Sequence, residues 1–507
     1  MEKKVNQLQW GAILSYAQMA IGIIVGLLYT PVMIRLLGQS EYGLYSTVSS
    51  TISLLSVLSL GFNSSYIRYY STYKKDNNQD AIAKLNGLFI IIFSIIGTLV
   101  LICGIVMSFH LTWFFDKGLT SQEYAIARVL ALLLTVSLAL SFPMGVFSHI
   151  ISAHERFVFL KLVSIAKTVI SPLTTVLLLF LGYRSIAMVT VTLCVSFIAD
   201  SIYIVYAKTK LKAKFSFHGF EKGLLKSLFA YTSFIAINII VDQINNNVDN
   251  FLLGRFKGTE VVAVYAVGYT LYHYYVMFST AVSNVFTPRI HRIVNDTEGD
   301  DVKQRAELTD LFVKVGRIQF LILGLIASGM VFFGQPFIYY WAGEGFTHSY
   351  YVALLLILPS TIALIQNIGI SIQRAQNRHQ FRSIAYLIMA FVNLTLSIFL
   401  CQKYGAVGSA VGTAISLIFA NGLIMNIYYH KRCNVDVVVF WKNIVRMLLG
   451  VIIPAIFGVV LMRFIDLYVI WKLCVFIVVY TAVYCASVWL ISMNTYEKSL
   501  IKRFLKK

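Results

Sequence analysis

A row of polar side chains interrupts one apolar stretch of the sequence at helical spacing. Within residues 228–254 the polar positions include Asn238, Asp242, Asn245, Asn246 and Asp249. Positions i, i+4, i+7, i+8 and i+11 share one face of an α-helix, and this face spans about 17 Å at 1.5 Å per residue. A carboxylate at the depth of the lipid chains is costly and marks a path for ions or substrate. The pattern therefore predicts either the lining of an aqueous path or a hydrogen-bonded seam between helices.

Two neighbouring patterns have the same spacing. Tyr265, Tyr269, Tyr272 and His273 lie at i, i+4, i+7 and i+8. A tyrosine ring with a hydroxyl on its rim suits stacking on sugars, and the alternative is aromatic core packing. An earlier stretch places serines on one face, at positions Ser46, Ser49, Ser50 and Ser53. Such hydroxyls either line a polar path or join helices.

Four further charges lie in or beside apolar stretches. Lys167 and Asp200 fall about 12 Å from the same end of consecutive predicted helices. They predict either a structural ion pair or a phosphate-binding lysine with an acidic modulator. Arg35 and Arg255 lie near the other end, where they act either as snorkelling anchors or in gating or pyrophosphate contact.

The composition predicts an all-α, polytopic membrane protein. Of 507 residues, 58% are hydrophobic and 13% charged, whereas soluble domains have about 45–50% apolar and about a quarter charged residues. Apolar runs of roughly 20 residues, long enough to cross the hydrocarbon, recur along the chain. Cytoplasmic loops rich in Lys and Arg account for the net charge of +20, so no nucleic-acid partner is expected. The six cysteines have no CxxC spacing, so no metal site or disulfide framework is expected.

The hydropathy pattern predicts fourteen transmembrane helices. Their expected ranges are 10–37, 42–62, 86–108, 124–147, 158–181, 186–207, 228–254, 260–287, 312–333, 349–370, 383–401, 406–429, 445–462 and 468–491. The loops and adjoining helix ends on the side of both termini hold 32 Lys and Arg residues, those on the opposite side hold 9, and Lys167 lies within a span. This asymmetry predicts that both termini are cytoplasmic.

The connections are too short for a soluble catalytic domain on either face, and no GxxxxGK[ST] phosphate loop occurs. We therefore expect no enzymatic activity and no cofactor.

Three stretches recur at a nearly constant offset. Arg35 to Gly38 with Tyr45 matches Arg255 to Gly258 with Tyr265 at an offset of 220. Similar matches relate residues 153–159 to 375–381, and Tyr183 to Tyr404. We therefore expect two six-helix repeats, which are parallel because six is even. The expected divisions are an N-terminal lobe at 1–210, a C-terminal lobe at 211–432, and two additional helices with a basic cytoplasmic tail at 433–507.

Several motifs resemble the polysaccharide-export flippases of the Wzx type. They are TPVMIRLLGQSEYGLYS at 30–46, VDNFLLGRFKGTEVVAVYAVGYTL at 248–271 and KYGAVGSAVGTAIS at 403–416. These flippases belong to the superfamily that also contains multidrug and lipid II exporters, and the resemblance covers essentially the whole chain.

The resemblance implies a V-shaped, two-lobe transporter of the bacterial cytoplasmic (inner) membrane. Its substrates would be undecaprenyl-diphosphate-linked oligosaccharide repeat units for capsule, O-antigen or other exopolysaccharide. They would move by alternating access through a cavity lined by helices one, two, seven and eight. A polysaccharide polymerase and a chain-length regulator are the implied partners. The matching positions are Arg35, Asp242, Asp249, Arg255 and His273. Two aspartates in helix seven favour coupling to a proton or sodium gradient over simple attraction of an anion.

Three other functions remain open at this point. The first is an ion-coupled multidrug or metabolite antiporter of the same superfamily. The second is a membrane-embedded glycosyltransferase or polymerase, which the short outer loops disfavour. The third is a non-transporting scaffold for glycan assembly.

Overall fold

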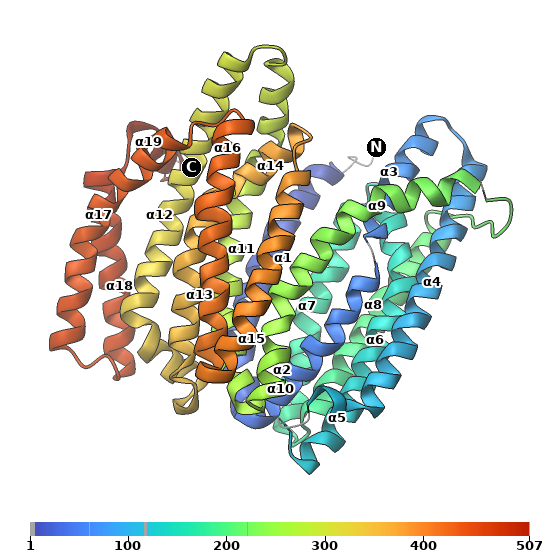
Figure 1. The fold of residues 1–507 in the computed structure, drawn as a ribbon, viewed down its shortest axis with the longest axis horizontal. Helices are drawn as coiled ribbons and strands as arrows, with labels where there is room; N and C mark the ends of the chain where they lie inside the picture. Colours follow the sequence, from blue (N-terminus) through green and yellow to red (C-terminus); the bar gives the residue numbers. More distant parts are fainter. Residues whose placement is uncertain (1–5, 60, 116–118, 221, 506–507) are drawn as a thin grey trace. The chain divides into compact units, whose positions relative to one another are not determined.

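A computed structural model describes residues 6–59, 61–115, 119–220 and 222–505, and within these ranges the chain forms helices and turns without a strand (Figure 1). The predicted all-α membrane fold is confirmed. Contacts between residues divide the chain into two compact units, Met1–Ala263 and Val264–Lys507.

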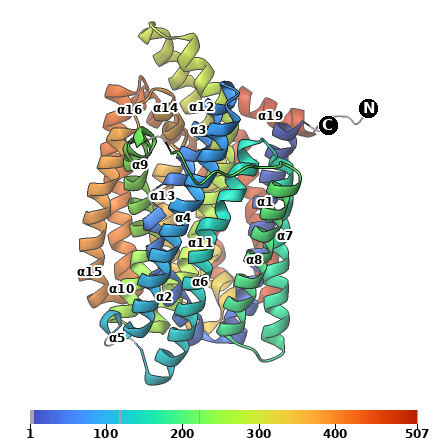
Figure 2. The ribbon, with the colours of Figure 1, turned by 90° about the vertical axis from the view of Figure 1, so that its right-hand side faces the viewer.

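The first unit is a bundle of long helices. Within it α4 packs against α6, α6 against α8, and α7 against both α1 and α8 (Figures 1 and 2). Its core includes Tyr66, Phe89 and Phe93, with rings in edge or tilted contact. The elements are α1 (Gln7–Leu37), α2 (Gln39–Ser53), the 3₁₀ turn η1 (Leu54–Ser59), α3 (Phe62–Lys75), α4 (Gln79–Phe109), α5 (Leu111–Phe114), α6 (Ser121–Ala153), α7 (Phe157–Phe180), α8 (Ser185–Thr209), α9 (Lys222–Gln243), the π turn η2 (Ile244–Val248) and α10 (Asp249–Phe256).

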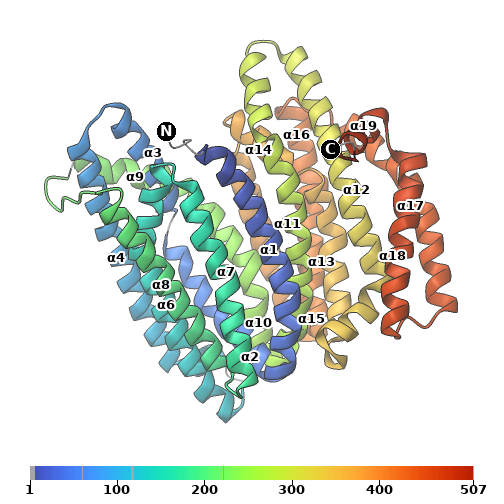
Figure 3. The ribbon, with the colours of Figure 1, turned by 180° about the vertical axis from the view of Figure 1, so that it is seen from behind.

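The second unit is built around α12. This helix packs against α13, α17 and α18 (Figure 3), and Phe312 on it contacts the rings of Tyr429 and Phe440 edge-on. α11 begins just before the division between the units. The elements are α11 (Thr259–Asp296), α12 (Asp301–Ala342), η3 (Glu344–Phe346), α13 (Ser349–Leu364), α14 (Ile368–Ala375), α15 (Gln380–Leu417), η4 (Ile418–Met425), α16 (Asn426–Arg432), α17 (Val437–Phe464), α18 (Ile470–Ser487), η5 (Val488–Ser492) and α19 (Thr495–Leu505).

Among the described residues, ten helices are long and apolar enough to cross a membrane, or eleven if the bent pair α13 and α14 forms one span. Gly405, with φ 59° and ψ −137°, bends the segment that contains α15 into two helices. The interrupted segments α2–η1–α3 and α9–η2–α10 are not among these candidate spans. Counting each of these two segments as one span and the two halves of the bent α15 segment separately would raise eleven to the expected fourteen, and that count stays a prediction.

Two predicted helices are interrupted at their polar faces. The helix expected at 42–62 ends as α2 at Ser53 and continues as the 3₁₀ turn η1. The helix expected at 228–254 contains the π turn η2 between α9 and α10. Serine and asparagine side chains compete with the backbone for hydrogen bonds, which weakens regular helix where they are dense.

The division between the two compact units follows Ala263, later in the chain than the lobe boundary at residue 210 that the repeats predict. α9 packs against η1 and α3, and α10 packs against α2, so the seventh predicted helix belongs to the first unit by its contacts. The lobe boundary expected at residue 210 follows the repeat in the sequence and stays a prediction.

Unusual backbone conformations recur with the spacing of the repeat. Gly38 and Gly258 have φ of 81° and 89° and begin the second helix of each copy. Positive φ recurs at Asn77 and Gly299, at Glu155 and Asn377, and at Lys212 and Asn434, each pair 222 positions apart. Residues other than glycine rarely adopt positive φ. The turns therefore support the internal duplication independently of the residue matches.

Candidate functional site

The first unit contains a polar cavity of about 230 Å³. α2 contributes Ser49 and Ser53, α6 contributes Ser137 and Ser141, α7 contributes Lys167, and α8 contributes Ser196 and Asp200, with Ile52, Leu134 and Leu138 completing the wall. Three of these helices each supply two polar residues four positions apart, which places both on one helix face. The structure therefore brings Lys167 and Asp200 together with half of the predicted serine face.

Several groups in this cavity form no hydrogen bond with the residues that the structure describes. Within the described residues, Lys167 and Asp200 form no hydrogen bond and no direct ion pair, although they interact electrostatically. The hydroxyls of Ser53 and Ser137 likewise have no hydrogen-bond partner in the part of the chain that the structure describes. The two side chains are therefore not in direct contact, and the choice between a structural ion pair and a phosphate-binding lysine stays a prediction. Because charges without hydrogen bonds are costly within a span, water or a ligand in the cavity would stabilise them.

The remaining cavity serines came from no sequence prediction. Ser141 Oγ donates to the carbonyl of Leu138 at 2.7 Å, and Ser196 Oγ donates to the carbonyl of Thr192 at 2.6 Å. Their oxygens keep lone pairs that can accept hydrogen bonds. The spacing of 137 and 141, and of 196 and 200, is the same as that of 49 and 53, and this repeated spacing is the signal that could have found them.

The polar stripe of the seventh predicted helix is divided in the structure. Asp242 and Asn246 are exposed, Asn238 and Asn245 are half-buried, and Asp249 is only 3% exposed. The π turn η2 lies inside the stripe and takes one more residue per turn than an α-helix. Positions on its two sides therefore do not share one face, and the prediction of a continuous stripe is wrong at Asp249.

The buried end of this stripe packs against α2. Asn250 Nδ2 donates to Ser50 Oγ at 2.9 Å. Gly254 lies so close to Thr47 that an added Cβ would collide with its side chain. Small residues at such crossings let helix backbones approach closely. Ser50 therefore serves helix packing, whereas Ser49 and Ser53 face the cavity; Ser46 is also buried.

Glu123, which no sequence pattern indicated, joins the starts of three helices. Its Oε1 accepts from Ser40 Oγ at 2.8 Å and from Thr259 Oγ1 at 2.7 Å. Its Oε2 accepts from the backbone N–H of Thr120 at 2.8 Å, as part of a capping box at the start of α6. The carboxylate therefore fixes the first turns of α2, α6 and α11 to one another.

Each of the two repeat-related arginines lies in the last turn of a helix. Arg35 is exposed in the last turn of α1, and Arg255 lies in the last turn of α10. Arg255 Nη1 donates to the carbonyl of Trp113 at 3.5 Å. A cation in the last turn also stabilises the helix dipole. These contacts favour the anchor interpretation for Arg255, and a role of either arginine in gating or pyrophosphate contact stays a prediction.

The predicted aromatic face lies on α11. The ring centroids of Tyr265 and Tyr269 are 6.2 Å apart, and those of Tyr269 and Tyr272 are 5.6 Å apart. Tyr265 is 1% exposed, Tyr269 and Tyr272 are half-buried, and His273 is exposed. Core packing therefore describes Tyr265, while sugar contact stays a prediction for Tyr269, Tyr272 and His273.

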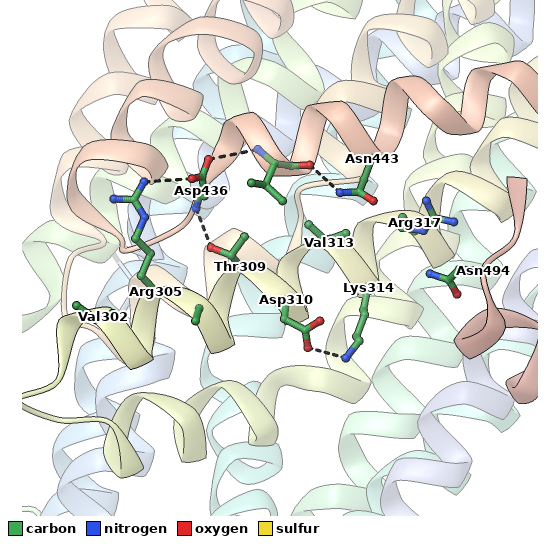
Figure 4. Close-up of a pocket in the computed structure, with 12 residues that line it drawn as sticks. Val302, Arg305, Thr309, Asp310, Val313, Lys314, Arg317, Asp436, Asn443 and Asn494 are labelled. Atoms are coloured by element: carbon green, nitrogen blue, oxygen red, sulfur yellow. Dashed lines mark hydrogen bonds and ion pairs between the residues drawn. The ribbon is translucent and has the colours of Figure 1, made fainter.

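The second unit contains a charged cavity of about 590 Å³ along α12 and α17 (Figure 4). Arg305 pairs with Asp436 at 3.4 Å, and Lys314 pairs with Asp310 at 2.6 Å. Burial would raise the pKa of Asp436, but the backbone N–H groups of Val439 and Val438 and the Arg305 charge together hold this pKa below its usual value. Because carboxylates already offset its cations, this cavity fits an external ion less well than the cavity of the first unit.

Within the described ranges, no group of three or more His, Cys, Asp or Glu side chains could hold a metal ion. The chemistry available at the candidate site is therefore that of hydroxyls, one ammonium group and one carboxyl group.

Comparison with known proteins identifies relatives along the chain. The model of a family described as "Polysaccharide biosynthesis protein" matches residues 9–294. A putative O-antigen transporter of Shigella flexneri is 20% identical over 410 residues, which cover 79% of this chain and 92% of that protein. A probable low-salt glycan biosynthesis flippase of Haloferax volcanii is 26% identical over 212 residues, which cover 40% of this chain and 42% of that protein.

Solved structures share the fold at low sequence identity. The lipid II flippase MurJ in an inward closed conformation matches with a TM-score of 0.68 and 16% identity, covering 98% of this chain and 99% of that one. An inward-facing multidrug resistance transporter of the MATE family matches with a TM-score of 0.63 and 13% identity, covering 85% of this chain and 99% of that one. At such identities the likeness shows the fold alone.

Proposed function

The chain belongs to the polysaccharide biosynthesis protein family, and from this membership we propose that it moves undecaprenyl-diphosphate-linked oligosaccharide repeat units across the bacterial cytoplasmic membrane. The units are destined for capsule, O-antigen or another exopolysaccharide, and they move by alternating access. The name of the Shigella flexneri relative, a putative O-antigen transporter, supports this substrate class. The all-helical fold is shared with a lipid II flippase.

The observation that carries the proposal is the exposure of Asp242 and Asn246 near the middle of the segment Lys222–Phe256. A carboxylate in contact with lipid chains is too costly at this depth. The exposed Asp242 carboxylate therefore indicates that this part of the segment is in contact with water. A wet face of this kind supports passage of a glycan, which carries many hydroxyls.

The proposal includes a coupling ion and partners. A proton or a sodium ion on Asp242 supplies the driving force, and both termini lie in the cytoplasm. A polysaccharide polymerase and a chain-length regulator act on the delivered repeat units.

The test uses a strain that lacks the gene and accumulates lipid-linked repeat units facing the cytoplasm. The wild-type chain restores the surface glycan. Asp242→Leu reduces this restoration at least tenfold at equal membrane expression, because it removes the charge from the wet face. Asp296→Leu is the matched control, since Asp296 is an exposed aspartate in the last turn of α11.

Two outcomes would overturn the proposal. The first is a deletion strain with normal surface glycan and no accumulated intermediate. The second is export of cationic drugs that depends on Asp242 while glycan assembly is unaffected, which would assign the chain to the antiporters.

A further inference from the structure

We propose that the cavity lined by Lys167 and Asp200 binds one phosphate group of the lipid carrier, and that binding takes up one proton onto Asp200. This inference rests on the proposed function, because it names the part of the substrate that the cavity holds. It also gives the cavity a separate role from the exposed face of α9.

The size of the cavity selects a small polar group. Its volume of about 230 Å³ has room for several waters. This volume is enough for one phosphate group with its bound water. The cavity therefore serves as a subsite for part of the substrate.

The unpaired groups are mainly donors. Lys167 offers three N–H donors, and the hydroxyls of Ser53 and Ser137 offer one each; in the described part of the chain no protein acceptor takes any of them. Phosphate oxygens are strong acceptors, and a lysine ammonium binds them as a point charge. The apolar residues Ile52, Leu134 and Leu138 lower the local dielectric, which strengthens such bonds.

Charge balance requires the proton. Lys167 and Asp200 together carry no net charge, so a phosphate diester entering the cavity would leave one uncompensated negative charge inside the span. Protonation of Asp200 removes this charge. It also changes the carboxyl from an acceptor into a donor that can bond the phosphate. Proton uptake and phosphate binding therefore favour each other.

The other groups around Asp200 allow this coupling. α7 presents Lys167, whereas α2 and α6 present only serine and apolar side chains to the cavity. On α8 itself, Tyr203 interacts electrostatically with Asp200. Lys167 is thus the only cation that the described cavity wall contributes, so one substitution removes the attraction for phosphate.

The experiment measures binding of a farnesyl diphospho-N-acetylglucosamine to the purified full chain in nanodiscs between about pH 5.5 and pH 8. A diphosphate diester does not titrate in this range, so any pH dependence belongs to the protein. For one linked proton, affinity should rise by up to about tenfold for each unit of falling pH. Asp200→Asn should bind tightly and independently of pH, because an amide is neutral and donates as the protonated carboxyl does.

Loss of the ammonium group should weaken binding at every pH. Lys167→Gln is expected to lower affinity about 10- to 100-fold, as for loss of hydrogen bonds to a charged group. Lys161→Gln is the matched control on the same helix, because Lys161 bonds to Gln18 at 3.2 Å and does not line the cavity. If Lys167→Gln does not fold, Ser137→Ala should weaken binding at low pH and retain the wild-type pH dependence.

The inference is overturned if wild-type affinity is independent of pH, or if Lys167→Gln binds as tightly as Lys161→Gln. Equal competition by N-acetylglucosamine without the diphosphate would assign the cavity to a sugar ring and would also overturn it. The complementation assay keeps the two proposals apart. If the expected binding is not observed but the wild-type chain restores surface glycan, the phosphate site is rejected and the proposed function is retained.

Discussion

The charged side chains of this protein differ in how closely they are paired. Arg317 on α12 and Glu497 on α19 form a buried ion pair, with side chains 6% and 2% exposed. Arg317 Nε lies 2.5 Å from Glu497 Oε1, and Arg317 Nη2 lies 2.9 Å from Oε2. Arg317 Nη2 also donates to the carbonyl of Ser492 at 2.7 Å. Helix α19 is thus attached to α12 by a bidentate pair, whereas Lys167 and Asp200 interact electrostatically without a direct contact among the described residues.

We expect Glu497→Ala to destabilise the second unit by about 3–5 kcal/mol, because it leaves the Arg317 guanidinium buried without its partner. Thermal unfolding of the purified protein in detergent measures the loss. Asp310→Ala is the control, since Asp310 is 53% exposed and its pair with Lys314 is worth about 0.5 kcal/mol or less. Equal melting temperatures for the two variants would contradict the expectation. A double change, Arg317→Met with Glu497→Met, should recover most of the stability.

Prediction from the sequence succeeds for residues whose environment is set by their own helix. Lys167 and Asp200 lie in apolar stretches at matching depth, so their proximity was predictable. The Arg317–Glu497 pair was not, because its partners are 180 positions apart and neither interrupts an apolar stretch at mid-span. Glu123 was missed for the same reason: its partners Ser40 and Thr259 come from distant helix starts.

At the scale of elements, periodicity predicts the helices but not their local departures from α geometry. The stripe from Asn238 to Asp249 was projected at the spacing of a regular α-helix, and the π turn η2 rotates its end away. The run Asn245, Asn246 and Asn247 weakens regular helix locally, but the sequence does not fix where the π turn forms. α9 contacts η1 and α3, α10 contacts α2, and the π turn lies between these contacts.

The close crossing of α2 with the start of α11 depends on one glycine. A Cβ at Gly43 would collide with the backbone carbonyl of Thr259, which cannot move without moving α11. We expect Gly43→Ala to cost about 1–3 kcal/mol, as overpacking does, and to disturb the hydrogen bonds of Glu123 with Ser40 and Thr259. The melting temperature should fall accordingly.

Gly22→Ala on α1 provides the control, because nothing lies within 4 Å of the added Cβ. Alanine is also the better helix former, so this change should be neutral or stabilising. A Gly43→Ala protein as stable as Gly22→Ala would show that α2 and α11 can separate without loss.

At the scale of the whole chain, the duplication sets the topology. Turns with positive φ recur 222 positions apart at three pairs of sites, and 220 apart at Gly38 and Gly258. The residue matches between the two copies are short, but each lies beside a residue with positive φ. The two C-terminal helices, α17 and α18, follow the second copy without a counterpart in the first. Overall topology was therefore more predictable than side-chain contacts, because it depends on hydropathy and turn residues that act locally.

Parallel repeats place equivalent links on the same side of the membrane, since each copy contributes an even number of spans. Lys210 and Arg432 are equivalent, exposed positions near the end of each copy, and Tyr183 and Tyr404 are equivalent, exposed positions one span earlier. We expect single cysteines at Lys210 and Arg432, in a background without the native cysteines, to react with a membrane-impermeant maleimide only in inverted vesicles. Cysteines at Tyr183 and Tyr404 should react only in right-side-out vesicles, because the side rich in Lys and Arg is cytoplasmic. Labelling of Lys210 and Arg432 from opposite sides would mean an odd number of spans between them and would exclude the parallel duplication.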